Sequence, residues 1–365
     1  MRATYRLLVG AHEVEARSEA LHLEQTVELP REAVHDREVE REILARVESI
    51  EPDPEAGFRA VVAYPVATTA WDPAQLLNLL FGNSSLQPDV ELVDVELAPS
   101  LLDALGGPRF GIDGWRKLAD VEGRALTCTA LKPMGLGPDA LADLARTFAR
   151  AGLDVIKDDH GLADHPFCRF EDRVRACQSA IDSVAAETGH RALYVPNLTG
   201  TPPAIFRQLE LAADVGVGAA MLSPMLVGLP LLFELARARS PLPLIGHPSL
   251  AGVQRIAAPV LLGTLFRAFG ADAVIYPHFG GRFSYPEVVC HDLAERLRAP
   301  CRSLRPALPI AAGGMSVERV PELLGFYGSD TMLLIGGSLY RAGPALLDRS
   351  REFVDAVKRA SGERP

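Results

Sequence analysis

Positive charge is scarce in this sequence. The 37 lysine and arginine residues are outnumbered by 47 aspartate and glutamate residues, and the formal net charge is −10 at pH 7. Nucleic acid binding needs a basic surface, so we expect no nucleic acid partner. An anionic small molecule can still bind through a few local positive groups.

Cysteines are also few, and long hydrophobic runs are missing. The five cysteines are scattered and form no CxxC pair, which favours a reducing cytoplasm over a disulfide framework. No apolar run without charge or proline reaches the ~18 residues that a membrane span needs, so we expect no membrane partner. Residues 1–10 contain no apolar core followed by a small-residue cleavage site, so we expect no secretion signal.

The remaining composition is that of a globular protein, with 48% hydrophobic and 23% charged residues. A chain of 365 residues is longer than one hydrophobic core usually serves. We therefore expect two domains, residues 1–115 and residues 116–365.

The first domain mixes extended runs with helical ones. We predict strands over residues 3–9, 24–29, 58–65 and 90–97, and helices over residues 13–23 and 72–81. Mixed elements of this kind are typical of a small α+β sheet domain.

The second domain repeats one unit eight times: a short apolar run followed by a helical segment. The runs cover residues 125–131, 153–159, 192–198, 219–225, 242–248, 271–277, 308–314 and 331–337. Eight such units predict an α/β fold of the (β/α)8, or TIM, barrel type. The alternative is a doubly wound open sheet, but the KPMGLGP loop after the first run lacks the GxGxxG spacing typical of that fold.

Polar residues and paired glycines recur where the predicted strands end. They are Lys132, Lys157, Asp158, Asp159, His160, Asn197, His247, His278, Gly313 with Gly314, and Gly336 with Gly337. The active sites of TIM barrels lie at the carboxyl ends of the strands, so this edge is the predicted site.

Lys157 and Asp159 point to the same side of their strand, because successive strand residues alternate. A salt-bridged strand end is the structural alternative. Carboxylates suit Mg²⁺, but a protonated lysine is not a metal ligand. Lys157 would bind a cation only after CO2 adds to its neutral amine and makes a carbamate.

The glycine pairs and the histidines each have two interpretations. Paired glycines make tight turns with φ above zero, but barrels often bind phosphate after the seventh and eighth strands through backbone N–H groups. His247 and His278 are either core residues or groups that contact substrate, and their strand-end positions favour contact.

Several long segments resemble the RuBisCO superfamily. They are EQTVELP (24–30), AYPVATTAWDPAQLLNLLFGNSS (63–85), residues 110–174, YVPNLTG (194–200), GHPSLAG (246–252) and PIAAGGM (309–315). The resemblance implies an N-terminal α+β domain of ferredoxin-like type packed against the barrel of a partner subunit. It also implies a homodimer, or a higher oligomer of dimers, with shared active sites.

The resemblance also assigns roles. Lys157 matches the lysine that is carbamylated, and Asp159 matches an aspartate that binds Mg²⁺. His160 stands where the family has a metal-binding glutamate, and the metal identity stays open because imidazole suits softer metals. Lys132 matches the first lysine of the KPK motif, which handles protons. The remaining matches are two active-site histidines, His247 and His278, the phosphate-binding Gly313, Gly314, Gly336 and Gly337, and Glu24 and Asn83, which the partner subunit contributes.

Several family residues are replaced. Met134 takes the place of the second KPK lysine, Pro248 that of a phosphate-binding arginine, and Ala312 that of a serine. The loop HFGGRFSYP (278–286) contains no lysine, although the carboxylase uses one there to hold CO2. These departures are similar to those of the non-carboxylating RuBisCO-like proteins, and they favour a substrate with a single phosphate.

The retained residues are those needed for enolisation. We expect an enzyme that enolises or isomerises a phosphorylated sugar-like substrate, such as a methylthio-ketose phosphate, with a divalent metal. The alternative is a decarboxylase or acyl-cleaving enzyme acting on a phosphorylated 3-keto sugar acid. A second alternative is a barrel that only binds or regulates.

Overall fold

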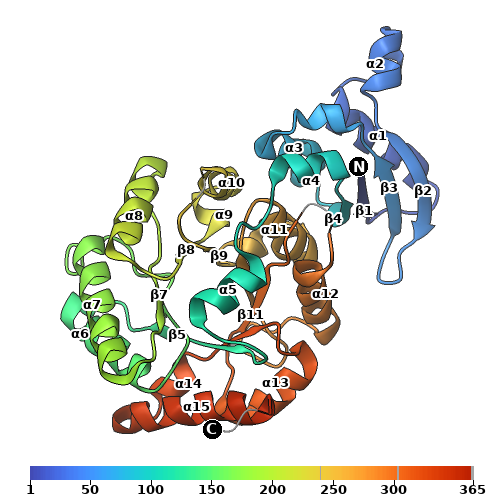
Figure 1. The fold of residues 1–365 in the computed structure, drawn as a ribbon. Coiled ribbons are helices and arrows are strands. Elements are labelled where there is room, and N and C mark those ends of the chain that lie inside the picture. The colour runs from blue at the N-terminus through green and yellow to red at the C-terminus, as the bar shows by residue number, and fades with distance from the viewer. Residues whose placement is uncertain (239, 302–303, 363–365) are drawn as a thin grey trace.

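The computed structural model describes residues 1–238, 240–301 and 304–362. Figure 1 shows an N-terminal sheet domain, in blue, beside a larger barrel. The sheet is antiparallel with the order β2-β3-β1-β4. Its strands are β1 (Arg2–Leu7), β2 (Arg46–Pro52), β3 (Phe58–Ala63) and β4 (Val90–Glu96). Its helices are α1 (Val14–Thr26), α2 (Arg37–Glu42), α3 (Pro73–Phe81) and α4 (Pro99–Leu105).

The predicted strand over residues 24–29 is wrong, because α1 continues to Thr26. Gln25 fixes this last turn: its Nε2 donates to the carbonyl of Leu79 at 2.7 Å, and its Oε1 accepts from the Ser84 hydroxyl at 2.9 Å. The alternating pattern of EQTVEL therefore does not mark a strand. Gln25, a polar residue of that pattern, is buried because its side-chain amide is hydrogen-bonded. The sequence interpretation also missed β2, whose RVESIEP pattern has no buried apolar face.

The second domain is the predicted α/β barrel, with eight parallel strands in the order β7-β6-β5-β12-β11-β10-β9-β8. They are β5 (Leu126–Leu131), β6 (Val155–Asp158), β7 (Leu193–Val195), β8 (Ala220–Leu222), β9 (Leu244–Gly246), β10 (Ala273–Pro277), β11 (Leu308–Ala312) and β12 (Met332–Leu334). A bridge between Asn197 and Met221 joins the ends of β7 and β8 and so brings the two outer strands together. Each strand falls within one of the eight predicted runs.

Helices surround the barrel as Figure 1 shows. They are α6 (Pro138–Arg150), α7 (Phe170–Thr188), α8 (Pro202–Val215), α9 (Pro224–Val227), α10 (Leu229–Arg237), α11 (Phe266–Ala268), α12 (Glu287–Arg298), α13 (Val320–Tyr327), α14 (Gly337–Tyr340) and α15 (Leu346–Ala360). The segment Pro259–Leu265 before α11 is π-helical. Within the described ranges, no helix is long and apolar enough to cross a membrane.

Helix α5 (Gly111–Ala119) packs against the barrel interior. Its Ile112 and Trp115 belong to the same buried cluster as Cys128 of β5 and Val155 of β6. The predicted domain boundary after residue 115 falls inside this helix. We propose to place the boundary before α5, so that the whole helix belongs to the barrel domain.

The two domains are joined by main-chain hydrogen bonds. Leu92 of β4 donates to the carbonyl of Arg255 at 2.9 Å and accepts from the N–H of Ala257 at 2.9 Å. The Arg255 guanidinium donates to the carbonyls of Ser85, Gln87 and Val90 at 2.6, 2.6 and 3.0 Å. Backbone bonds of this kind fix the N-terminal sheet against the side of its own barrel.

Candidate active site at the carboxyl ends of the barrel strands

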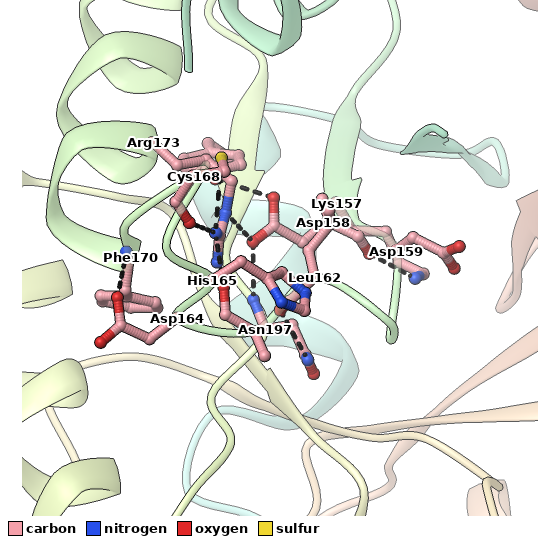
Figure 2. A network of polar contacts seen from close by, with 12 residues as sticks. Lys157, Asp158, Asp159, Leu162, Asp164, His165, Cys168, Phe170, Arg173 and Asn197 are labelled. Carbon is pink, nitrogen blue, oxygen red and sulfur yellow. Dashed lines mark hydrogen bonds and ion pairs between the residues drawn. The ribbon is translucent and has the colours of Figure 1, made fainter. Parts of the chain in front are cut away.

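Lys157 and Asp158 leave β6 in opposite directions, as strand alternation predicts. Lys157 is 2% exposed and sits with the buried strand ends, whereas Asp158 forms an ion pair with Arg173 of α7 at 3.0 Å. Lys157 therefore forms no salt bridge with the two aspartates that follow it, and the alternative of a salt-bridged strand end does not describe this segment. Figure 2 shows Asp158 turned toward α7 and Asp159 turned away from it.

The amine of Lys157 is buried without an acidic partner. Its Nζ donates to the carbonyl oxygen of Asp158 at 2.7 Å, and it forms no ion pair within the described part of the chain. Burial lowers the pKa of Lys157, because the charged ammonium loses its hydration. A lowered pKa increases the fraction of neutral amine, which is the form that can add CO2.

Asp159 lies between two nitrogen donors. Its Oδ2 accepts from Lys132 Nζ at 2.5 Å, and its Oδ1 lies 3.0 Å from His160 Nδ1. Burial alone would raise the pKa of Asp159, but the hydrogen bonds from His160 and Lys132 hold it well below its ordinary value. Asp159 is therefore a carboxylate at neutral pH.

His160 and His247 bring the second and fifth strand ends together. Their rings are stacked, with centroids 4.3 Å apart and planes at 16°. The backbone N–H of Ser249 donates to His247 Nδ1 at 3.2 Å, so the neutral ring carries its proton on Nε2. Burial, with the charge of Lys157, lowers the pKa of His247 to about 2. His247 is thus a neutral hydrogen-bond donor rather than a cation.

His278 lies on the other side of the barrel mouth, next to the first glycine pair. Its backbone N–H donates to the carbonyl of Ala312 at 2.9 Å. Its side chain is fully buried, and neither ring nitrogen has a hydrogen-bond partner in the described chain. Burial, together with the charge of Arg319, lowers the pKa of His278 to about 4. The hydrogen-bonding capacity of this imidazole is therefore unused in the described chain.

The two glycine pairs differ in conformation. Gly313 and Gly314 have φ of 97° and 86°, as the tight-turn interpretation predicts, but Gly336 and Gly337 do not have positive φ. A Cβ on Gly314 would lie 2.8 Å from the backbone N of Arg282, so the turn requires glycine there. Among the described residues, no hydrogen bond uses the backbone N–H groups of Gly313, Gly314, Gly336 or Gly337.

Lys132 lies between Asp159 and the second glycine pair. A Cβ on Gly336 would lie 3.8 Å from Lys132 Cε, so this glycine and this lysine are neighbours. The backbone N–H of Lys132 donates to the Tyr340 hydroxyl at 3.0 Å, which in turn donates to the carbonyl of Ala130 at 2.9 Å. These bonds fix where Lys132 leaves β5.

Glu24 and Asn83 lie together in the N-terminal domain, away from this cluster. Asn83 Nδ2 donates to Glu24 Oε1 and to Glu28 Oε1, both at 2.9 Å. Sequence reasoning missed Glu28, which has a φ of 54°. No described contact joins these side chains to the barrel mouth of the same chain.

A divalent metal would fit the cluster only if Lys157 is modified. Within residues 1–238, 240–301 and 304–362, no group of three or more His, Cys, Asp or Glu side chains is placed to hold a metal ion. A carbamate on Lys157 would add oxygen ligands beside Asp159 and His160, which is the set that the family resemblance implies. The buried amine of Lys157 is suited to that modification.

Ser249 and Asn197 also contribute to the site, although the sequence analysis assigned no role to either. Ser249 fixes the tautomer of His247, and Asn197 binds main-chain atoms of the segment that carries His160. Asn197 is recognisable in the sequence as the polar end of the third strand. Ser249 gives no pattern that would distinguish it from a loop serine.

Comparison with known proteins places the chain in a family. Residues 111–258 match the family described as the ribulose bisphosphate carboxylase large chain, catalytic domain. The chain is 48% identical to ribulose bisphosphate carboxylase-like protein 1 of Rhodopseudomonas palustris, over 97% of this chain and 96% of that protein. It is 43% identical to a 5-methylthioribulose-1-phosphate isomerase of Rhodospirillum rubrum, over 99% of this chain and 97% of that protein.

A solved structure is similar over the whole chain. The Rubisco-like protein from Rhodopseudomonas palustris superposes with a TM-score of 0.92 at 43% identity, covering 100% of this chain and 99% of that one. Overall fold and sequence therefore point to the same family. The chain belongs to the RuBisCO-like proteins, the non-carboxylating branch of the RuBisCO superfamily.

Proposed function

We propose that this protein is an isomerase acting on 5-methylthioribulose 1-phosphate or a close ketose phosphate, without CO2 fixation. The isomerase of Rhodospirillum rubrum, 43% identical over nearly the whole length, supports this substrate class. The observation that carries the proposal is the cluster of Lys132, Asp159 and the buried, unpaired Lys157 at the barrel mouth.

A divalent cation, Mg²⁺ or a softer metal, belongs to the proposal. Carbamylated Lys157, Asp159 and His160 would hold it, and CO2 is then a cofactor as the lysine carbamate. When bound, the cation would act as a Lewis acid that makes the carbon-bound proton next to a carbonyl more acidic.

Lys132 is the proposed acid–base group. Isomerisation of a ketose removes a proton from a carbon next to the carbonyl and delivers a proton to the former carbonyl carbon. The Lys132 amine contacts Asp159 and is 35% exposed at its side chain, so it borders the mouth where substrate would enter. A positioned acid–base group typically contributes about 10²–10⁴-fold to the rate.

His247 and His278 are the proposed binders of substrate oxygens. The Nε2–H of His247 is a donor held in one tautomer by Ser249, and it does not compete as a base because its pKa is about 2. His278 brings two ring nitrogens without protein partners. Together the two rings would orient the carbonyl and hydroxyl groups of a sugar chain.

The glycine pairs are the proposed phosphate site. Gly313, Gly314, Gly336 and Gly337 present backbone N–H groups without hydrogen-bond partners in the described chain. Such groups bind phosphate oxygens without needing an arginine. Pro248 cannot donate a hydrogen bond, which supports a substrate with one phosphate rather than two. The absence of lysine from residues 278–286 supports a reaction that does not fix CO2.

A homodimer, or a larger assembly of dimers, completes the proposal. Exposed apolar side chains lie in the loops and short helices that follow the barrel strands: Met134, Phe167, Leu226, Leu250, Val253 and Phe283. Others lie near Glu24 and Asn83 in the N-terminal domain, at Leu29, Trp71 and Leu86. Exposed apolar surface of this kind marks contact sites. A head-to-tail dimer would bury both sets and bring Glu24 and Asn83 to the partner's barrel mouth.

The five free cysteines support a reducing compartment such as the cytoplasm.

A substrate comparison tests the proposed reaction. The protein is incubated with bicarbonate and a divalent metal, and with 5-methylthioribulose 1-phosphate, a 3-keto sugar-acid phosphate or ribulose 1,5-bisphosphate. Products are followed by NMR and by CO2 release. We expect isomerisation of the methylthio sugar phosphate and no carboxylation. Release of CO2 from the keto acid, without isomerisation, would instead identify a decarboxylase. Binding without any turnover would identify a non-catalytic barrel.

A further inference from the structure

A polar network lies on the outer side of β6, between the barrel and α7, and Figure 2 shows it. We infer that Arg173 and Asn197 are positioning residues: they hold the segment 159–168, which carries Asp159 and His160, in the geometry of the site. The importance of that geometry rests on the proposed function, but the holding itself does not.

Asp158 is the centre of the network. Its Oδ2 accepts from Arg173 Nε at 3.0 Å and from the backbone N–H of Asn197 at 3.1 Å. Its Oδ1 accepts from the Tyr194 hydroxyl at 2.9 Å. The side chains of Asp158 and Arg173 are both fully buried. A buried ion pair with further hydrogen bonds is fixed in position, because breaking it would leave an uncompensated buried charge.

From this centre, two side chains reach the segment through its carbonyl groups. Asn197 Nδ2 donates to the carbonyl oxygens of His160 and Leu162 at 3.0 and 3.1 Å. Arg173 Nη1 donates to those of Ala163 and Cys168 at 2.9 and 3.4 Å. The donors come from outside the segment, and they bind its main chain rather than its side chains.

The bonds of Asn197 allow one orientation of its amide. Both N–H groups of Nδ2 are used by carbonyl acceptors, and Oδ1 is buried without a hydrogen-bond partner in the described chain. An aspartate of the same shape would direct carboxylate oxygens at two carbonyl oxygens, which repel it. This position therefore requires the two N–H donors of an asparagine amide, and not only a side chain of that size.

The segment needs such support because much of it is exposed. Asp164, Pro166 and Phe167 are exposed, and residues 159–168 belong to no named strand or helix. The side chains of Asp159 and His160 contact Lys132 and His247. The main chain of the same segment is held by the hydrogen bonds of Asn197 and Arg173. Groups that orient metal ligands from behind typically contribute 10–100-fold to metal affinity or activity.

The test compares Asn197→Asp and Asn197→Ser with a matched control, Gln208→Ala. Gln208 is also an amide that binds main chain after β7: it accepts from the N–H of Thr199 at 2.9 Å and donates to its carbonyl at 3.0 Å. Arg173→Lys, with Arg175→Lys as its control on the exposed side of α7, tests the second arm. Asn197→Ser keeps the backbone bond to Asp158, and its shorter side chain replaces the two amide donors by a single hydroxyl.

The first measurement is amide hydrogen exchange of residues 159–168 in the whole protein. We expect exchange at least about 10-fold faster in both Asn197 variants, with the rest of the barrel unchanged and the control equal to wild type. Unchanged exchange in the segment, or an equal increase in Gln208→Ala, would overturn the inference.

The second measurement is Mn²⁺ affinity by electron paramagnetic resonance, with bicarbonate present. We expect about 10–100-fold weaker binding in the Asn197 variants and in Arg173→Lys, each measured at a temperature at which circular dichroism shows the variant to be fully folded. Equal Mn²⁺ affinity across all variants would contradict the positioning role. If wild type binds no Mn²⁺, the proposed metal site fails, and the exchange measurement still decides whether the network holds the segment.

Discussion

Lys132 and Asp159 form an ion pair across the ends of two neighbouring strands, with Nζ 2.5 Å from Oδ2. The same carboxylate contacts His160 through its other oxygen. Any ligand that takes over Oδ2 releases the lysine amine at the barrel mouth. The pair therefore couples occupation of the carboxylate to the freedom of the proposed acid–base group.

Replacing Lys157 by methionine should abolish metal-dependent activity without unfolding the protein. The substitution removes the buried amine that would become the carbamate. It puts an apolar side chain of similar length in a buried place where a polar amine without an acidic partner costs stability. We expect no Mn²⁺ binding, no turnover, and a free energy of unfolding equal to or above that of wild type. Full turnover by this variant would refute the assignment of Lys157.

His160→Glu should shift metal preference toward Mg²⁺. Glutamate replaces an imidazole by hard oxygen ligands, which suit Mg²⁺ better than softer metals. The ratio of Mg²⁺ affinity to Co²⁺ affinity, measured by calorimetry on the whole protein, should increase about 10-fold or more. An unchanged ratio would show that His160 acts only as the hydrogen-bond partner of Asp159.

Asp272→Ala should destabilise the barrel and leave the site intact. The carboxylate of Asp272 accepts from the backbone N–H groups of Phe110, Gly111 and Leu244 at 2.6, 2.9 and 2.9 Å, so it ties the start of α5 to the barrel. Loss of the acceptor should cost about 3 kcal/mol in urea unfolding. Asp113→Ala, at an exposed position of α5, is the control and should cost less than about 0.5 kcal/mol.

Stability should depend on pH through His278. Burial lowers its folded pKa to about 4, whereas an unfolded histidine titrates near pH ~6.5. The unfolded chain therefore takes up the proton first. The contribution is complete above the unfolded pKa and is lost as the pH falls toward the folded one, by about 1.4 kcal/mol per pKa unit.

His278→Asn removes this contribution. As the pH is lowered from about 7 to about 4.5, the unfolding free energy of wild type should therefore fall by more than that of the variant. Parallel stability curves over that range would contradict the shifted pKa.

The barrel could be predicted from sequence because each strand is buried on both faces and each helix repeats its apolar stripe. The same logic failed at β2 and at the end of α1. The edge strand β2 has no buried apolar face, and Gln25 is buried through hydrogen bonds that join residues distant in sequence.

Some features of the site could likewise be predicted from the sequence, and others could not. Lys132, Lys157, Asp159, His160 and His247 were predicted from their places at strand ends, and the structure brings them together. The stacking of His160 on His247 and the partnership of Glu28 with Asn83 depend on side-chain directions across the fold. Residue spacing along the chain contains no record of those directions.

Exchange of carbon-bound hydrogen tests the central claim most directly. The protein is incubated in D2O with 5-methylthioribulose 1-phosphate, bicarbonate and a divalent metal, and deuterium at the carbons beside the carbonyl is followed by NMR. Wild type should incorporate deuterium or form the isomer, and Lys157→Met and Lys132→Met should do neither. Exchange or isomerisation that persists in both variants, or the absence of both from wild type, would contradict enolisation at this cluster.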